Sequence, residues 1–249
     1  MSSQTFKIII PFYNVEQYIG KTVASAAAQD YDNYQCILIN DKSTDSSMEI
    51  CRSMVGTNDK FILVDNDVKK CSLENIYDAI MNHTSDDDIV VILDGDDFLF
   101  GPSVLTHLSE VYSTEDCWLT YGSYLNLSTR TRGKFARQIP QSIILNNQYR
   151  DFEWCASHLR TFKASLFKKI DPRDLKDKNE KFFTITGDLV IMFPMLEMAA
   201  HRSKYIEKLL YIWNDTNTLN DHKKDHTKQL RVEREIRNRK SRLSKNIHI

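Results

Sequence analysis

Short apolar runs alternate with amphipathic stretches along the first half of the chain. Between the runs, residues 15–29, 43–54 and 72–83 place apolar side chains at helical spacing. The runs themselves are rich in β-branched residues, which is typical of buried strands, and they cover residues 6–10, 34–40, 61–65 and 89–93. This β-α-β-α-β-α-β order predicts an α/β fold, a Rossmann-like open and mainly parallel sheet with helices on both faces.

The second half of the chain is less regular. Residues 186–200 are almost entirely apolar and predict a buried helix, broken or begun near Pro194 because proline has no N–H to donate. Further elements are expected as a helix after residue 102, a strand at 117–127, a short helix at 162–170 and a last strand at 204–214. No repeat or hinge-like linker divides these elements, which favours one domain with a tail.

The tail is defined by its charge. The whole chain holds 33 lysines and arginines against 34 acidic residues, yet residues 222–249 hold ten against three. Leu230, Ile236 and Leu243 recur at loosely helical intervals, so residues 223–249 predict a basic helix. Such a helix either packs by one edge and is otherwise solvated, or is attracted to an anionic membrane or acceptor. No basic-aromatic motif accompanies the charge, so no nucleic-acid partner is expected.

Composition narrows the class further. No run approaches the roughly 20 apolar residues of a membrane span, and the first residues lack the pattern of a secretion signal, so a soluble cytoplasmic protein is expected. The cysteines are scattered, with no C-x-x-C pair, which favours buried free thiols over a disulfide framework or a zinc site. They are Cys36, Cys51, Cys71, Cys117 and Cys155.

Acidic residues follow the predicted strands. Asp41 follows the second strand, and Asp94, Asp96 and Asp97 surround one glycine after the fourth. The carboxyl ends of parallel strands meet at one edge, where such sheets bind ligands. Clustered carboxylates repel one another unless water or a cation separates them. The turn therefore predicts either solvated acids or a site for Mg²⁺ or Mn²⁺ with positions left for phosphates.

Glycine-rich phosphate loops are absent from the sequence. Neither G-x-x-x-x-G-K-[ST] nor G-x-G-x-x-G occurs among the seven glycines. A nucleotide bound at this sheet would therefore be held largely through its metal ion.

Three spaced motifs together resemble those of a known family. IIIPFYNVEQYI, ILINDKSTDSS and VVILDGDD resemble a family 2 glycosyltransferase of the GT-A fold, the inverting enzymes that use nucleotide-sugar donors. The resemblance is strong over residues 6–100 and looser to about 222. It implies a glycosyltransferase domain over residues 1–222, with a nucleotide-binding half at 1–100 and an acceptor-binding half at 101–222.

The resemblance also implies roles for individual residues. Asp188, which opens the predicted helix in TGDLVIMF, would be the general base, although Gly187 stands where the family more often has glutamate. Asp96 would coordinate the metal ion with Asp97 as a supporting neighbour. The nucleobase end would be formed by Pro11, Phe12, Tyr13 and Asp41, with Asp94 near base and ribose.

Three further residues remain open. Arg160 could clamp the diphosphate and His158 could touch donor or acceptor, or they could be a surface arginine and a packed histidine. His222 follows the last strand, where related enzymes sometimes supply a further metal ligand.

These features predict an inverting, metal-dependent glycosyltransferase. It would move a sugar from a nucleotide donor, with UDP expected, to a glycan or lipid-linked acceptor. A sugar nucleotidyltransferase is a rival, but it would carry a glycine-rich basic loop where this chain has PFYNVEQ. A non-catalytic module that binds nucleotide sugars or glycans is the other alternative.

Overall fold

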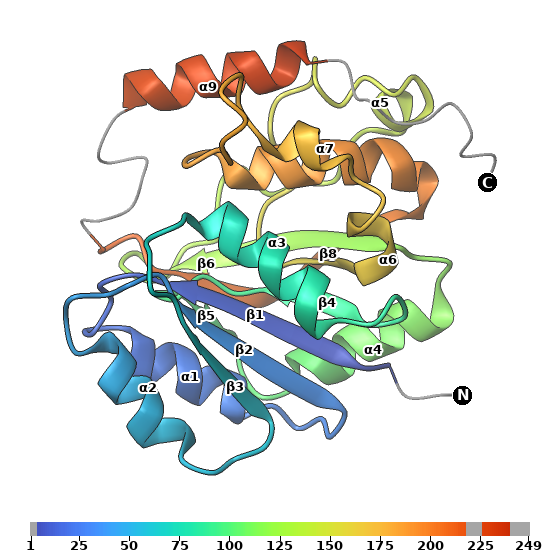
Figure 1. The fold of residues 1–249 in the computed structure, drawn as a ribbon. Helices are drawn as coiled ribbons and strands as arrows, with labels where there is room; N and C mark the ends of the chain where they lie inside the picture. Colours follow the sequence, from blue (N-terminus) through green and yellow to red (C-terminus); the bar gives the residue numbers. More distant parts are fainter. Residues whose placement is uncertain (1–3, 218–225, 240–249) are drawn as a thin grey trace.

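The computed structural model describes residues 4–217 and 226–239 and contains one eight-stranded sheet (Figure 1). Its strand order is β3-β2-β1-β4-β7-β6-β8-β5. The first four strands pair in parallel, as the apolar runs predicted. They are β1 (Phe6–Phe12), β2 (Tyr34–Asn40), β3 (Phe61–Asp65) and β4 (Ile89–Ile92).

The other half of the sheet is mixed. Two of its strands, β6 (Leu119–Asn126) and β8 (Ser203–Trp213), match predicted strands and pair in parallel. The other two, β7 (Arg160–Lys163) and β5 (Phe98–Leu99), run antiparallel to their neighbours and were not predicted. Although β4 and β5 follow each other in sequence, β7, β6 and β8 lie between them in the sheet.

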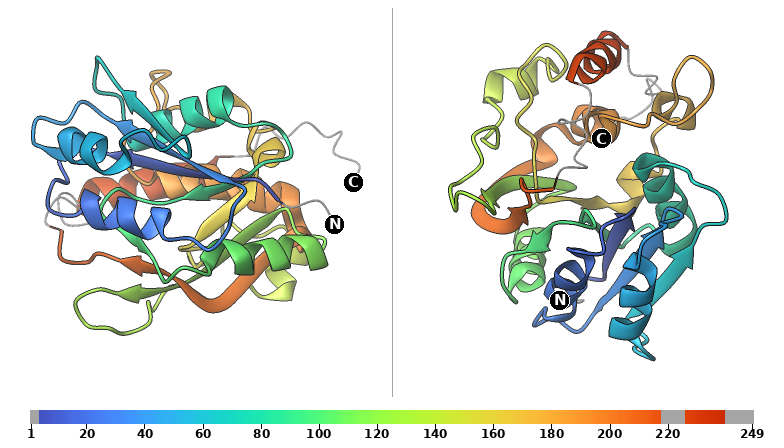
Figure 2. Two further views of the ribbon diagram at one scale, coloured as in Figure 1. Left: turned by 90° about the horizontal axis from the view of Figure 1, so that it is seen from below. Right: turned by 90° about the vertical axis from the view of Figure 1, so that its left-hand side faces the viewer.

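Helices cover both faces of the sheet (Figures 1 and 2). Side chains alternate along β1, so Ile8 and Ile10 pack into one core and Ile9 into the other. The first core receives α1 (Ile19–Ala27), α2 (Ser47–Val55) and α4 (Val104–Thr114). The second receives α3 (Ser72–His83), α6 (Ala164–Phe167) and α7 (Gly187–Ala199). Shorter elements are α5 (Gln141–Leu145), η1 (Pro172–Leu175) and η2 (Ala200–Arg202).

Helix α7 runs through Pro194 without a break, so the expectation of a helix broken or begun there was wrong. Every residue from Leu189 to Leu196 is buried. This burial on all sides stabilises the helix by more than the missing proline hydrogen bond costs, about 3 kcal/mol. The helix begins instead at Gly187, immediately after Thr186 in a left-handed backbone conformation (φ 57°).

The basic tail forms helix α9 (His226–Asn238), which lies along α7 (Figure 1). Val232 and Ile236 are buried in the same core as α7, whereas Leu230 is 49% exposed. Arg237 Nη1 donates to the backbone oxygens of Arg150 at 2.8 Å and Phe152 at 2.7 Å. Over these residues the tail is therefore a helix packed by one edge. Leu243 lies outside the described residues.

All five cysteines are buried free thiols, as predicted. Within residues 4–217 and 226–239, none of the helices combines the length and apolar character that crossing a bilayer requires.

Candidate active site

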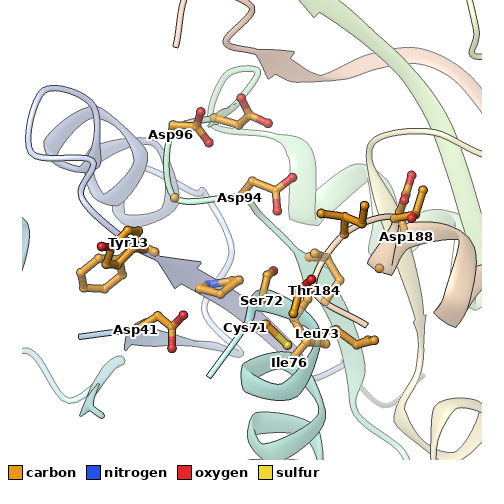
Figure 3. Close-up of a pocket in the computed structure, with 18 of the residues that line it drawn as sticks. Tyr13, Asp41, Cys71, Ser72, Leu73, Ile76, Asp94, Asp96, Thr184 and Asp188 are labelled. Carbon is orange, nitrogen blue, oxygen red and sulfur yellow. The ribbon is translucent and has the colours of Figure 1, made fainter. Parts of the chain in front are cut away.

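A cavity of about 580 Å³ opens at the carboxyl ends of β1, β2 and β4. Its far wall comes from residues 183–188, at the start of α7. In Figure 3, Tyr13 and Asp41 lie at one end of the cavity and Asp188 at the other, with Asp94 between them. The cavity brings together every predicted site residue that the structure describes, namely Pro11, Phe12, Tyr13, Asp41, Asp94, Asp96, Asp97, His158, Arg160 and Asp188. His222 lies outside the described residues.

The end formed by β1 and β2 holds a fixed carboxylate. Asp41 is 5% exposed, and its N–H donates to the Phe12 carbonyl at 2.9 Å. Its Oδ1 accepts from the backbone N–H of Lys70 at 2.8 Å. The ammonium of Lys69 lies 2.9 Å from the centroid of the Tyr13 ring, a cation–π contact. Both lysines line the cavity and were not predicted, although KK lies one residue beyond the third acidic strand ending.

The DGDD turn is held rigidly against the neighbouring elements. Thr22 of α1 donates its hydroxyl to the Gly95 carbonyl at 2.9 Å, and the Asp97 N–H donates to the Asp94 carbonyl at 3.0 Å. A side chain at Gly95 would collide with the end of β1, because its Cβ would lie 2.5 Å from the Cβ of Phe12. The turn therefore needs glycine, and it presents Asp94 and Asp96 to the cavity.

Asp97 points inward rather than toward the cavity opening. It is 2% exposed; its Oδ2 accepts from the Tyr211 hydroxyl at 2.6 Å and its Oδ1 from the Asn214 N–H at 2.7 Å. Burial, followed by the charges of Asp96 and Asp94, raises the pKa of Asp97 well above its ordinary value. Asp97 thus fastens the turn to β8.

Asp96 is joined to the segment after β8. The Asn217 side-chain amide donates to Asp96 Oδ2 at 2.7 Å, and Asn217 itself is buried and lines the cavity. Neither Asn214 nor Asn217 was predicted. Their contacts join positions 117 and 121 residues apart, and nothing local in the sequence marks them.

Arg160 and His158 form a second group in the cavity wall. Arg160 is 5% exposed and therefore not a surface arginine. Its Nη1 lies 3.3 Å from Asp188 Oδ2, and its Nη2 lies 3.7 Å from Asp94 Oδ2. The same Nη2 lies 3.1 Å from His158 Nδ1. A guanidinium has only protons to give, so His158 Nδ1 is the acceptor and the ring proton sits on Nε2.

His158 is consequently a neutral imidazole. Its ring stacks on Tyr211 with centroids 4.5 Å apart and planes at 8°. Burial, then the charge of Arg160, lowers the pKa of His158 well below its ordinary value. With Nδ1 occupied by Arg160, the remaining nitrogen serves as a hydrogen-bond donor.

Asp188 stands in the first turn of α7, where the helix dipole favours an anion. Burial raises the pKa of Asp188, the charge of Arg160 lowers it, and Asp94 raises it further, so that the pKa lies above its ordinary value. A carboxylate with a raised pKa beside a cavity is suited to accept a proton near neutral pH.

The acidic turn also fits a divalent cation. Asp94, Asp97 and His158 each place one candidate ligand atom within 4.8 Å of the others. Carboxylate oxygens suit Mg²⁺ or Mn²⁺. His158 is the weakest member, because ligation through Nε2 would move its proton to Nδ1, against Arg160.

Comparison with known proteins places the chain in a family. Residues 7–171 match the model described as glycosyl transferase family 2. The chain belongs to this family. It is therefore a glycosyltransferase domain, and its open sheet with helices on both faces agrees with the GT-A structures that it resembles.

The curated relatives of this transferase include bacterial glycosyltransferases. Glycosyltransferase GlyG of Streptococcus pneumoniae serotype 4 is 28% identical over 226 residues, which cover 81% of this chain and 72% of GlyG. The minor teichoic acid biosynthesis protein GgaA of Bacillus subtilis is 36% identical over 81 residues, or 28% of this chain and 18% of GgaA.

Solved structures support the same fold. S. aureus TarS 1-349 in complex with UDP-GlcNAc superposes with a TM-score of 0.67 at 17% identity, covering 94% of this chain and 65% of that one. Mannosyltransferase PcManGT from Pyrobaculum calidifontis, in complex with GDP-Man and Mn²⁺, has a TM-score of 0.61 at 16% identity, covering 97% and 66%. The transferase thus spans less than two thirds of either solved chain.

Proposed function

We propose that this transferase moves one sugar from a UDP-linked donor to a hydroxyl of a glycan or lipid-linked acceptor, with inversion and with a divalent metal ion. One arrangement carries the proposal. The fixed carboxylate of Asp41, the acidic turn and the carboxylate of Asp188 face one cavity in that order (Figure 3). The TarS structure in complex with UDP-GlcNAc and the PcManGT structure in complex with GDP-Man and Mn²⁺ support a nucleotide-sugar donor.

At the nucleobase end of the cavity, the nucleobase is lined by Pro11, Phe12 and Tyr13. Asp41 accepts a hydrogen bond from the polar edge of the nucleobase. The hydrogen bond from Lys70 to Asp41 Oδ1 fixes the orientation of that carboxylate. A fixed acceptor favours a base that offers an N–H at its edge, as uracil does. Asp94, in the middle of the cavity, lies near the base and ribose.

For the metal ion the proposal keeps Asp96, with Asp97 beside it, on the same turn that holds the candidate ligand atoms of Asp94 and Asp97. His222, which lies outside the described residues, is kept as the further ligand. A bound Mn²⁺ or Mg²⁺ would neutralise negative charge that develops on the departing diphosphate. The hydrogen bond from Asn217 orients Asp96, while Asp97 keeps the turn in place through Tyr211 and Asn214.

At the opposite end, Asp188 takes the proton of the acceptor hydroxyl as that oxygen attacks the anomeric carbon. The attacking oxygen and the leaving diphosphate lie on opposite sides of the sugar in a single displacement, which inverts the anomeric configuration. Partial burial strengthens Asp188 as a base, and Arg160 limits the rise of its pKa.

A lipid-linked acceptor would bring the transferase to a membrane surface. The outward side of α9 carries Leu230 and the exposed Arg231 and Arg234. A basic surface with an exposed leucine favours peripheral contact with anionic headgroups. Co-sedimentation with anionic but not zwitterionic vesicles, lost in high salt, is the expected result, and equal binding to both would contradict it.

The proposed function is tested by a thermal-shift panel of nucleoside diphosphates and nucleotide sugars with and without Mn²⁺, followed by assays of donor turnover. A ligand at 100 times its dissociation constant stabilises the native state by about 2.7 kcal/mol. We expect stabilisation selective for UDP-linked ligands and dependent on Mn²⁺, with release of UDP when an acceptor is added. Binding without turnover of any donor would favour a non-catalytic module, and formation of a nucleotide sugar from a sugar phosphate would favour a nucleotidyltransferase.

A further inference from the structure

Arg160 is a buried cation held between two carboxylates of the cavity. Its side chain is only 6% exposed, and its two Nη atoms point to Asp188 and to Asp94. Its Nε is buried and has no hydrogen-bond partner among the described residues. An arginine is costly to bury unless the surrounding charges fix it, so this position indicates a specific task.

The sheet explains why the arginine reaches both carboxylates. Strand β7 runs antiparallel to β4, and its first residue, Arg160, pairs with Ile92 at the end of β4. Asp94 follows two residues after Ile92, at the same edge of the sheet. Asp188 approaches from the other side on the first turn of α7. The backbone register therefore sets where the guanidinium lies.

We propose that Arg160 is a positioning residue for the general base: it holds the Asp188 carboxylate against the cavity wall and couples it to Asp94 on the donor side. The inference rests on the proposed function, since it assumes that Asp188 is the base. It assigns Arg160 a task other than the diphosphate contact that the sequence had left open as one alternative.

The hydrogen-bonding directions of Arg160 favour this assignment. Nη1 faces Asp188, and Nη2 is shared between Asp94 and His158. His158 accepts a hydrogen bond from Arg160 and stacks on Tyr211. Because the His158 ring is itself held by this stacking, it fixes the orientation of the guanidinium. A phosphate would have to compete with both carboxylates for the same Nη atoms.

Among the described residues, two charged groups shift the pKa of Asp188. Arg160 acts on it from β7, and Asp94 from the turn after β4. From α3, Leu73 lies against Gly187, and α9 contributes the uncharged Gln229 to the cavity wall. Arg160 is therefore the cation that offsets the burial of Asp188. Without it, the pKa of Asp188 would rise and the base would be protonated over a wider pH range.

The experiment compares Arg160→Met, Arg160→Lys and the control Arg52→Met. Arg52 also pairs with an aspartate, Asp65 at 2.9 Å, but the pair is exposed and outside the cavity lining. Three quantities are measured for each variant: the pH dependence of kcat for transfer, the affinity for UDP with Mn²⁺, and the pKa of Asp188 by ¹³C-carboxyl NMR. The Asp188 signal is assigned by its absence in Asp188→Asn.

We expect Arg160→Met to raise the pKa of Asp188 by at least about one unit and to move the acidic limb of the kcat profile up by the same amount. At pH 6, kcat should fall by about 10- to 100-fold, because less of Asp188 is ionised and its carboxylate is no longer held in position. UDP affinity should change by less than about threefold. For Arg160→Lys, the pKa of Asp188 and kcat should lie between the values of wild type and Arg160→Met. For Arg52→Met, both quantities should equal those of wild type.

Loss of UDP affinity by tenfold or more, with the pKa of Asp188 and the acidic limb unmoved, would overturn the inference and make Arg160 a donor ligand. The NMR measurement needs no turnover. If the wild type transferred no sugar, the proposed function would fail, while the titration would still report whether Arg160 controls Asp188.

Discussion

Gly95 packs against Phe12 so closely that the two residues leave no space for another atom. A Cβ at residue 95 would lie 2.5 Å from the Phe12 Cβ and 3.0 Å from the Pro11 carbonyl oxygen. The end of β1 and the acidic turn are thus one rigid surface, and the same contact fixes the position of Pro11 and Phe12 relative to the turn that carries Asp96.

Gly95→Ala should therefore damage both stability and binding. Forcing a methyl group into this contact should lower the free energy of unfolding by about 1–3 kcal/mol. UDP affinity with Mn²⁺ should fall with it, because the carboxylates move. Denaturant unfolding and calorimetry check the two effects. The matched control is Gly20→Ala in α1, where the added Cβ meets the Met54 sulfur of α2 at an ordinary 3.5 Å. This substitution should be neutral or slightly stabilising.

Asp96→Ala should abolish the part of UDP binding that depends on Mn²⁺ and leave the fold intact. Asp96 is only partly buried and faces the cavity, so its removal costs little packing. Titration calorimetry with and without Mn²⁺ measures the effect. Asp87→Ala, at the exposed opposite end of β4, serves as the control. Undiminished metal-dependent affinity in Asp96→Ala would refute the proposed ligand.

Asp188→Asn should keep donor binding and lose transfer by at least about 10²-fold, as expected when a general base is removed. The amide preserves the shape of the side chain but cannot take a proton. Initial rates at saturating donor, together with UDP affinity, separate the two effects. Transfer at the wild-type rate would show that another residue is the general base.

The pH dependence of transfer should follow the ionisation of Asp188. Its pKa lies above the ordinary aspartate value, and only the ionised form accepts a proton. Activity should therefore be complete above that pKa and fall as the pH drops through it, at a higher pH than an exposed aspartate would give. A kcat profile measured on the acidic side tests this, and a flat profile down to pH 4 would contradict it.

Arg150→Met should destabilise the protein strongly through α9. Arg150 and Glu197 form a pair at 2.5 Å with side chains 15% and 7% exposed, and Arg150 Nη1 also donates to the Ile236 carbonyl of α9 at 2.8 Å. Leaving Glu197 unpaired should cost about 3–5 kcal/mol. Arg52→Met breaks an exposed pair and should cost less than about 1 kcal/mol. Equal unfolding free energies for both variants would contradict the prediction.

The sequence could predict the first half of the fold because its signals are local. Each of β1 to β4 is an apolar run with its own turn residues, and the strand endings mark where ligands gather. The second half depends on pairing. Strand β5 has two residues and β7 only four, with Arg160 at its start, so neither could be recognised before its neighbour was known.

The candidate site also contains residues that the sequence could predict and residues that it could not. Asp41, Asp94 and Asp96 follow predicted strands, and the pattern of the sequence selected them. Asp188, in the first turn of α7, was selected by the resemblance to the family. The antiparallel β7 explains why Arg160 joins them, which the sequence left open. Asn214 and Asn217 form hydrogen bonds to residues 117 and 121 positions earlier in the chain, and only the folded sheet brings them to the acidic turn.

Because β4 and β5 are separated by three other strands, the DGDD turn is the point where the chain crosses from one half of the sheet to the other. Hydrogen bonds from the end of β8 and the residues after it hold the carboxylates of this turn. The donors are Tyr211, Asn214 and Asn217. Chimeras that graft residues 1–100 onto the second half of another transferase would therefore inherit these acids without the hydrogen-bond donors that orient them. Productive recombination in this scaffold should carry the end of β8 along with the turn.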